Sequence, residues 1–249
     1  MMPADIQGTT ILIESESGAH RLEFQEGPLV ANLVLADEIN RATPRTQSAF
    51  LEAMQERSVT VFGLSHSIDE PFSVFATQNP IEMEGPYPLP EAQLDRFFFK
   101  LAVQAPTVDE LAEIMARTTG AAPPPVTARF GPDVVRSMAV IIRQVKIADD
   151  TTRLVLRVIR ATHPDAPEAT EAVKKYVRYG ASPRGAQAII LAAKTLALLA
   201  GRYHASVDDV RRVAVPALNH RLILNFHGEM EHVAPVALVE QVLDTVLPR

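Results

Sequence analysis

Residues 33–41 read LVLADEINR, so four apolar residues run directly into two adjacent carboxylates. An unbroken apolar run predicts a strand that is buried on both faces, as in a parallel sheet under helices. Ligands of such sheets gather beyond the carboxyl ends of the strands, which is where Asp37 and Glu38 lie. Because successive side chains of a strand point to opposite faces, one carboxylate could hold a metal ion while the other polarises a water. Taken alone, the same pair could be two solubilising charges on a loop.

The composition is that of an ordinary globular protein. At 249 residues, of which 47% are hydrophobic, the chain can form one large domain or two modest ones. It has no cysteine, which excludes disulfides, thiolate chemistry and cysteine-bound zinc. We expect neither a secretory signal in residues 1–10 nor a membrane span, since no apolar run approaches the roughly 18 to 20 residues that a bilayer requires. These features fit a cytoplasmic protein, and the net charge of −6 argues against broad affinity for nucleic acid or anionic membranes.

The first half of the chain has the pattern of an α/β layer, in which strands alternate with helices. The helix after the opening strand has Thr43 as a good N-cap and Pro44 at its first position. The predicted elements, in chain order, are a hairpin at 9–24 that turns at Ser17-Gly18, a strand at 33–36, a helix at 44–57, a hairpin at 59–68, a strand at 72–76, a loop at 84–90, a helical turn at 91–96 and a strand at 97–103.

The character of the sequence changes after residue 106, and from residue 132 onward only helical patterns are found. Thr107 and Glu110 form a plausible capping box, and GAAPPP at 120–125 is the clearest linker. The predicted helices are 107–118, 132–146, 150–162, 168–179, 183–200, 207–224 and 235–247. We therefore expect an α/β domain at 1–119, a linker at 120–130 and an all-α subdomain at 131–249.

Polar residues at strand ends and helix starts form a set that suits phosphoryl transfer. That reaction needs a metal to neutralise charge, a group that polarises the attacking water, and cations on the γ-phosphate. Asp37 and Glu38 could supply the first two, and Asn79 could orient the water without adding negative charge. Arg96 follows a loop, and Arg184 opens a helix, where a guanidinium is well placed for a phosphate.

Each of these residues also has a plain structural interpretation. Asn79 precedes a proline and could belong to a common turn, Arg96 could be a solvating charge at a strand edge, and Arg184 could be an ordinary first-turn residue. Their occurrence together, in this order, favours the catalytic interpretation.

Three long motifs resemble those of the AAA+ ATPases, and in detail those of the MoxR family. LVLADEINRATPRTQSAFLEAMQER resembles the Walker B strand and the helix that follows it. FATQNPIEMEGPYPLPEAQLDRF resembles the sensor 1 segment and arginine-finger loop, and YGASPRGAQAIILAAKTLALLAGR resembles the sensor 2 helix. The two predicted hairpins match the positions of two extra hairpins in the family. The resemblance covers nearly the whole chain and implies a partial AAA+ core followed by a helical lid.

The resemblance also implies residue roles, with ATP and Mg²⁺ as cofactors. Asp37 would coordinate magnesium, Glu38 would polarise the hydrolytic water, and Asn79 would be sensor 1. Arg96 would be the finger that reaches the nucleotide of a neighbouring subunit, and Arg184 would be sensor 2. Such ATPases usually work as ring hexamers, because the finger comes from another subunit, and its removal in comparable enzymes costs roughly 10³ to 10⁵ in rate.

The sequence departs from the family pattern in one respect. A complete member carries a P-loop, Gly-x-x-x-x-Gly-Lys-Ser/Thr, upstream of the Walker B strand, and these 249 residues contain no such sequence. We therefore expect this chain alone to bind ATP weakly and to hydrolyse essentially none. We also expect a truncated fragment rather than a naturally P-loop-free protein, with apolar sheet surface exposed where the first strand and helix would pack.

Three functions remain as alternatives. The leading one is an ATPase that remodels or matures partner proteins, since the family is associated with von Willebrand factor A domain proteins and with metal insertion. The second is a non-hydrolysing interaction subunit that donates Arg96 to an active neighbour. A P-loop frame in the DNA upstream of Met1 would support the ATPase, and a ribosome-binding site with no such frame would support the subunit.

The third alternative is a nucleic-acid motor, because related hairpin-bearing AAA+ proteins include helicases. The hairpin at 59–68 contains no Lys or Arg, which argues against it. The seven histidines show no HExxH spacing and no G-x-S-x-G sequence occurs, so zinc and serine-hydrolase chemistry are also disfavoured.

Overall fold

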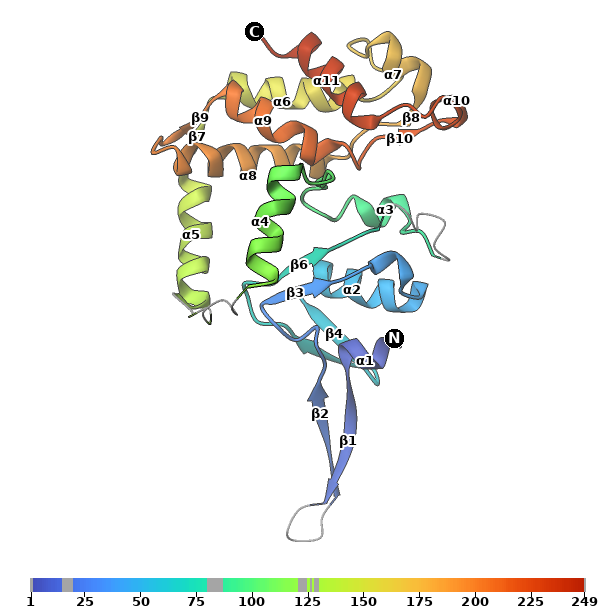
Figure 1. Ribbon diagram of the computed structural model, residues 1–249, viewed down its shortest axis with the longest axis vertical. Helices are drawn as coiled ribbons and strands as arrows, with labels where there is room; N and C mark the ends of the chain where they lie inside the picture. Colours follow the sequence, from blue (N-terminus) through green and yellow to red (C-terminus); the bar gives the residue numbers. More distant parts are fainter. Residues whose placement is uncertain are drawn as a thin grey trace.

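The computed structural model describes residues 2–14, 20–79, 87–120, 125, 127 and 130–248 (Figure 1). It has an α/β half, from which the hairpin at 8–26 protrudes, at one end and a helical half at the other. In the α/β half the elements are α1 (Pro3–Gln7), β1 (Gly8–Glu14), β2 (His20–Glu26), β3 (Leu33–Ala36), the 3-10 helix η1 (Ile39–Arg41), α2 (Pro44–Glu56), β4 (Ser58–Val61), β5 (Leu64–Ser67), β6 (Ser73–Ala76) and α3 (Glu91–Leu94).

The remaining elements are mostly helices. They are α4 (Val108–Thr118), α5 (Pro132–Gln144), β7 (Lys146–Ile147), α6 (Asp149–Ala161), α7 (Glu171–Tyr176), β8 (Val177–Tyr179), α8 (Pro183–Leu199), β9 (His204–Ala205), α9 (Val207–Leu218), β10 (Ile223–Leu224), α10 (Phe226–Met230) and α11 (Pro235–Val246). No helix in the described part of the chain is long and apolar enough to cross a membrane.

Strands β3 and β6 form the parallel pair that the sequence predicts. Their register runs from Leu33 opposite Ser73 to Ala36 opposite Ala76, so both strands end at the same edge. Both predicted hairpins are confirmed as the antiparallel pairs β1–β2 and β4–β5, while the predicted turn at Ser17-Gly18 lies outside the described residues.

The sheet is covered on one face only, so the predicted burial of β3 on both faces is wrong. Val34 and Ala36 are buried in a cluster with residues of α2, because alternate side chains share a face. On the other face Leu33, Leu35 and Phe75 are 66%, 70% and 62% exposed. No described element lies over that face, and the expected exposure of apolar sheet surface is confirmed.

Helix α2 begins as its sequence dictates. The Thr43 hydroxyl accepts the backbone N–H of Thr46 at 3.4 Å, and Pro44 occupies the first position. Phe50 and Ala53 lie on the buried face, which packs on the sheet. The helix therefore anchors the segment that follows β3.

The predicted strand at 97–103 is absent. Residues 97–103 form no ladder with β6, whose described pairing is with β3 alone. A strand needs a neighbour to satisfy its backbone, and the apolar residues that suggested this one stay exposed, with Leu101 at 73% and Val103 at 95%. The segment instead runs to the helical half.

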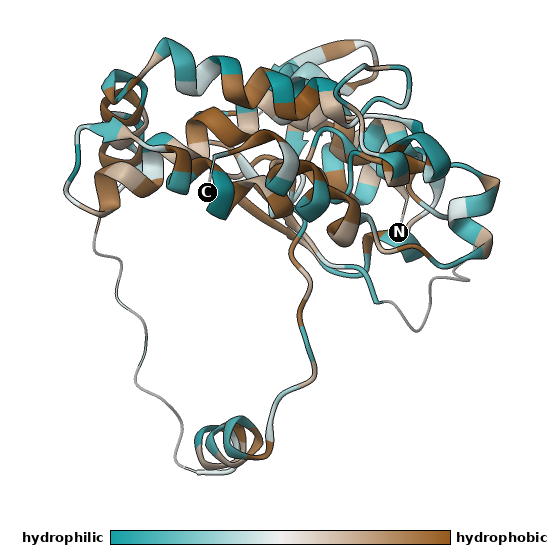
Figure 2. Ribbon diagram, turned by 90° about the horizontal axis from the view of Figure 1, so that it is seen from above, coloured by the Kyte–Doolittle hydropathy of each residue, from teal (hydrophilic) through white to brown (hydrophobic). Residues whose placement is uncertain are grey.

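Helix α4 stands apart from the rest of the described chain, as Figure 2 shows when α4 is seen end-on. Its capping box between Thr107 and Glu110 is confirmed. None of its residues is buried, and its apolar residues Leu111, Ile114 and Met115 are 41% to 50% exposed. Among the described residues, local signals are therefore what stabilises this helix.

The helical half encloses one continuous core that joins α6, α8, α9 and α11. Fully buried members come from each, among them Val158, Ile189, Leu218 and Val239. The expectation of helices only is wrong in detail, because β7 pairs with β9 and β8 pairs with β10. The predicted helices at 168–179 and 207–224 accordingly end earlier, at 176 and 218, where strands or turns begin.

Candidate functional site

The carboxyl ends of β3 and β6 remain side by side beyond the last paired residues. The N–H of Thr77 donates to the carbonyl of Ala36 at 3.0 Å, and the N–H of Ile39 donates to the carbonyl of Thr77 at 3.1 Å. These bonds hold Asp37 and Glu38 against the polar residues that follow β6. The structure thus brings together the strand-end acids and the segment that leads to Asn79.

Thr77 organises this edge, although the sequence analysis did not assign it a role. Its hydroxyl donates to Asp37 Oδ1 at 2.6 Å and accepts the backbone N–H of Glu38 at 2.8 Å. The signal was present in the sequence, since a hydroxyl residue directly follows the second strand. Its partner lies 40 positions away, so only the parallel pairing identifies the contact.

The two carboxylates turn to different partners, as the alternation of side chains predicts. Glu38 has a left-handed backbone with φ of 49°, and its carboxylate accepts Arg41 Nη1 at 2.7 Å. A left-handed conformation is uncommon for a residue with a Cβ and often marks a functional position. Asn79 is half-buried three residues beyond the end of β6.

The chemistry of this edge fits magnesium better than a metal that needs several protein ligands. Asp37 offers an exposed carboxylate, one oxygen of which is already oriented by Thr77. The described residues hold no group of three or more His, Cys, Asp or Glu that could bind a metal by itself. Magnesium usually takes one or two carboxylates and fills its other positions with waters and phosphate oxygens.

The two predicted arginines lie at the boundary of the two halves. Arg184 pairs with Asp95 at 3.2 Å, and Arg96 donates from Nη1 to the carbonyl of Leu51 on α2 at 3.0 Å. No described contact joins either guanidinium to Asp37 or Glu38. The structure therefore groups Arg184 with Asp95, the neighbour of Arg96, and the contacts described for the two arginines do not include the acids.

Asp95 is the centre of this boundary cluster. Its carboxylate accepts the Ser182 hydroxyl at 2.8 and 2.9 Å, and Arg221 Nε at 2.9 Å, in addition to Arg184. Burial alone would raise the pKa of Asp95, but the hydrogen bonds from Ser182 and Arg184 and the charge of Arg221 lower it overall.

His220 adjoins the same cluster and is buried. Its Nε2 lies 3.0 Å from the carbonyl of Phe97. Burial, assisted by the positive charge of Arg221, lowers the pKa of His220 to about 4. The imidazole is therefore neutral at physiological pH and serves as a structural hydrogen-bonding group.

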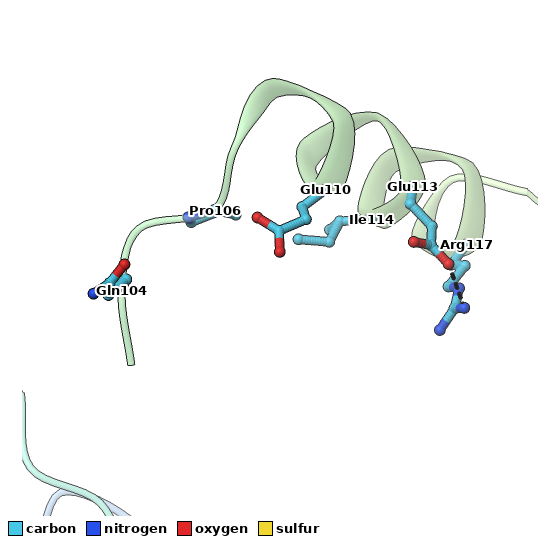
Figure 3. Close-up of a pocket in the computed structure, with 6 residues that line it drawn as sticks. All are labelled: Gln104, Pro106, Glu110, Glu113, Ile114 and Arg117. Carbon is cyan, nitrogen blue, oxygen red and sulfur yellow. Dashed lines mark hydrogen bonds and ion pairs between the residues drawn. The ribbon is translucent and has the colours of Figure 1, made fainter. Parts of the chain in front are cut away.

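Two shallow hollows occur on the described surface. Figure 3 shows one of about 320 Å³ along α4, lined by Gln104, Pro106, Glu110, Glu113, Ile114 and Arg117. It contains none of the predicted site residues. The other, of about 300 Å³, lies beside Arg96 and is lined by Ser48, Leu51, Glu52, Gln55, Glu56, Gln93 and Arg96.

Comparison with known proteins identifies the class to which this chain belongs. A family described as "ATPase family associated with various cellular activities (AAA)" matches residues 1–99, and an AAA lid domain matches residues 169–242. The protein is thus of the AAA+ ATPase class, with an α/β core and a helical lid. Below, the lid means residues 131–248.

Individual relatives identify the family within that class. The chain is 41% identical to Chaperone MoxR1 of Mycobacterium tuberculosis over 246 residues, which cover 99% of this chain and 64% of that protein. It is 36% identical to the uncharacterized protein YeaC of Bacillus subtilis, covering 73% of it. A solved structure of a candidate ATPase from Cytophaga hutchinsonii superposes with a TM-score of 0.84 at 34% identity, over 99% of this chain and 74% of that one. The chain belongs to the MoxR family of AAA+ ATPases.

Proposed function

We propose that this chain forms the Walker B, sensor 1 and lid parts of an ATP-hydrolysing MoxR-type motor that remodels or matures partner proteins. The observation that carries the proposal is the strand-end geometry, in which Thr77 orients Asp37 while the adjacent Glu38 points elsewhere. The proposed hydrolysis uses two acids with separate tasks at one sheet edge, and the parallel β3–β6 pair supports that arrangement.

Each residue of this edge has a task in the proposed reaction. Asp37 would hold Mg²⁺, which would neutralise charge on the phosphates when bound. Glu38 would accept a proton from the attacking water, and for this its carboxylate must leave Arg41. Asn79 would orient that water by hydrogen bonding.

The two arginines would stabilise negative charge on the transferred phosphoryl group. Arg96 would act on the nucleotide of a neighbouring copy, which requires a homo-oligomeric ring, and we propose a hexamer. Arg184 would respond to the nucleotide state from the lid. On the basis of the resemblance to the MoxR family, we propose protein clients, with von Willebrand factor A domain proteins as the first candidates. The name of the relative Chaperone MoxR1 supports protein clients in general.

The proposal is tested by hydrolysis in a chain that also carries a P-loop. A P-loop strand and helix with the pattern Gly-x-x-x-x-Gly-Lys-Ser/Thr are joined to residue 1, and phosphate release is measured with and without the variant Glu38→Gln. Loss of a general base should lower kcat by roughly 10² to 10⁴ with nucleotide affinity unchanged. Glu113→Gln, which changes an exposed acid on α4, is the matched control and should leave kcat unaltered.

The unmodified 249-residue chain provides the second arm. We expect it to bind ATP more weakly than micromolar and to release no phosphate, since it contains no P-loop sequence. If the extended chain binds ATP but neither hydrolyses it nor responds to Glu38→Gln, the ATPase proposal fails. The non-hydrolysing subunit that donates Arg96 is then the better description.

A further inference from the structure

The six residues at 95–100, which include Arg96, are held by one turn of the lid at 216–221. The N–H of Lys100 donates to the carbonyl of Pro216 at 2.9 Å, and Asn219 Nδ2 donates to the carbonyl of Lys100 at 3.0 Å. No described hydrogen bond joins the backbone of 97–100 to β3 or β6. The backbone that follows Arg96 is therefore hydrogen-bonded to the lid and not to the sheet, while the Phe97 side chain packs against the core of the α/β half.

Arg221 makes most of this attachment. Its side chain is 2% exposed. Nε donates to Asp95 Oδ1 at 2.9 Å, while Nη2 donates to the carbonyls of Asp95 at 2.9 Å and Phe97 at 2.7 Å. Nη1 donates to the carbonyls of Phe98 at 3.3 Å and Ala217. A guanidinium has five N–H groups, so every donor is used within the protein and none remains for a ligand.

The start of α8 rests on the same side chain. A Cβ built on Gly185 would lie 3.3 Å from Arg221 Cδ, so the helix end that carries Arg184 packs closely on Arg221. Arg184 and Ser182 also bind the carboxylate that Arg221 binds, that of Asp95. One buried guanidinium thus touches the supports of both functional arginines.

Arg96 itself is held much less completely. Its Nη1 donates to the carbonyl of Leu51, but its Nε is buried without a hydrogen-bond partner. Buried donors are nearly always satisfied, and an exception calls for an explanation. A side chain with an unused donor, on a backbone that is firmly fixed, is suited to exchange its present acceptor for another.

We infer that Arg221 is a positioning residue that places Arg96 and Arg184 as one unit with the lid. When the lid moves against the sheet, the turn at 216–221 carries the 95–100 segment and the start of α8 with it. This inference rests on the proposed function for the roles of Arg96 and Arg184. The attachment of residues 95–100 to lid residues 216–221 rests only on the hydrogen bonds described above and does not depend on the proposed function.

The variant Arg221→Lys tests the inference, because lysine keeps the charge but has three donors and no planar fork. Hydrogen exchange of the Lys100 amide and the ¹⁵Nε–H NMR signals of Arg96 and Arg184 are measured in the 249-residue chain. Exchange at Lys100 should accelerate by about tenfold or more, both signals should shift, and the β3–β6 amides should keep their exchange rates.

Arg202→Lys is the matched control, since Arg202 forms a two-pronged pair with Asp209 inside the lid, away from 95–100. It should leave Lys100 and both arginine signals unchanged. The inference is overturned if Arg221→Lys leaves them unchanged, or if Arg202→Lys shifts them equally, which would indicate general loosening of the lid.

The link to catalysis is measured separately in the extended chain. There Arg221→Lys should lower kcat by about tenfold or more while KM stays within about twofold. Normal kcat in that variant would overturn the positioning role even if the exchange result holds. If the extended chain with Arg221 intact shows no hydrolysis, the proposed function fails, and the exchange and NMR results still decide whether the attachment exists.

Discussion

The lid closes its own hydrophobic core, whereas the α/β half leaves one face of its sheet open. In the lid, Leu218 and Val239 are fully buried between helices. In the sheet, Leu33 and Leu35 are mostly exposed, although β3 is as apolar as the buried faces of the lid helices. The two halves thus bury comparable apolar residues to very different extents.

The difference follows from how each kind of element satisfies its backbone. A helix bonds its own N–H and C=O groups, so an amphipathic helix needs one partner face to be stable. A parallel strand needs neighbours at its edges and helices over both faces. The segment at 97–100, which has no strand beside it in the described fold, accordingly bonds to the lid.

The largest expected effect is a difference in the loss of stability when leucine is replaced by alanine in the lid and in the sheet. Leu218→Ala removes a fully buried side chain and should lower the free energy of unfolding of the lid by about 2 to 5 kcal/mol. Leu35→Ala, at a position 70% exposed, should cost less than about 0.5 kcal/mol. Hydrogen exchange of α9 and β3 amides reports each half separately. A loss above about 1 kcal/mol for Leu35→Ala would mean that this face is covered in solution.

Mild acid should weaken the junction between the halves before it weakens the lid core. His220 has a pKa of about 4 in the folded protein and near its ordinary 6.5 when unfolded. Between these two pH values the imidazole is protonated in the unfolded state but still neutral in the folded state. The free energy of unfolding therefore falls as the pH falls, by on the order of 3 kcal/mol. Arg221 and Lys100 oppose the protonated form, while Asp95 and the Phe97 carbonyl favour it.

Exchange of the Lys100 amide, corrected for its intrinsic pH dependence, measures this effect relative to an α8 amide. In His220→Gln, the difference in exchange between the Lys100 amide and the α8 amide should no longer change between about pH 6.5 and pH 4. If that variant keeps the same pH dependence of the exchange difference as the unmodified chain, the acid sensitivity belongs to another group. The lowered pKa of Asp95 acts below its ordinary value of 3.8, so its contribution is lost at lower pH than that of His220.

The smallest effect is expected at the β4–β5 turn of the α/β half. Phe62 has φ of 51° and Gly63 has φ of 79°, the signs of a type I′ turn, and Phe62 is 82% exposed. Asn is much better suited than Phe to the first position, so Phe62→Asn should stabilise the hairpin by about 0.5 to 1 kcal/mol. Gly63→Ala should destabilise it. Exchange of the β4 and β5 amides checks both, and destabilisation by Phe62→Asn would indicate that the aromatic ring makes contacts in solution.

Sequence reasoning found the elements that are set by neighbouring residues. Thr43 and Pro44 start α2, and Thr107 with Glu110 caps α4, because a cap is made by residues within one turn. The acids Asp37 and Glu38 were likewise found at a strand end. The error at 97–103 came from reading a short apolar run as a strand, since such a run does not show whether a partner strand exists.

The amino-acid sequence alone indicates where helices and hairpins begin and which side chains could do chemistry. Which of these side chains meet depends on the tertiary structure. Thr77 reaches Asp37 across a parallel pair, and Arg221 reaches Asp95 across 126 positions. Caps and alternation act over a few residues, but the partner of a buried charge or of a strand edge depends on how distant segments pack, and no local pattern encodes it.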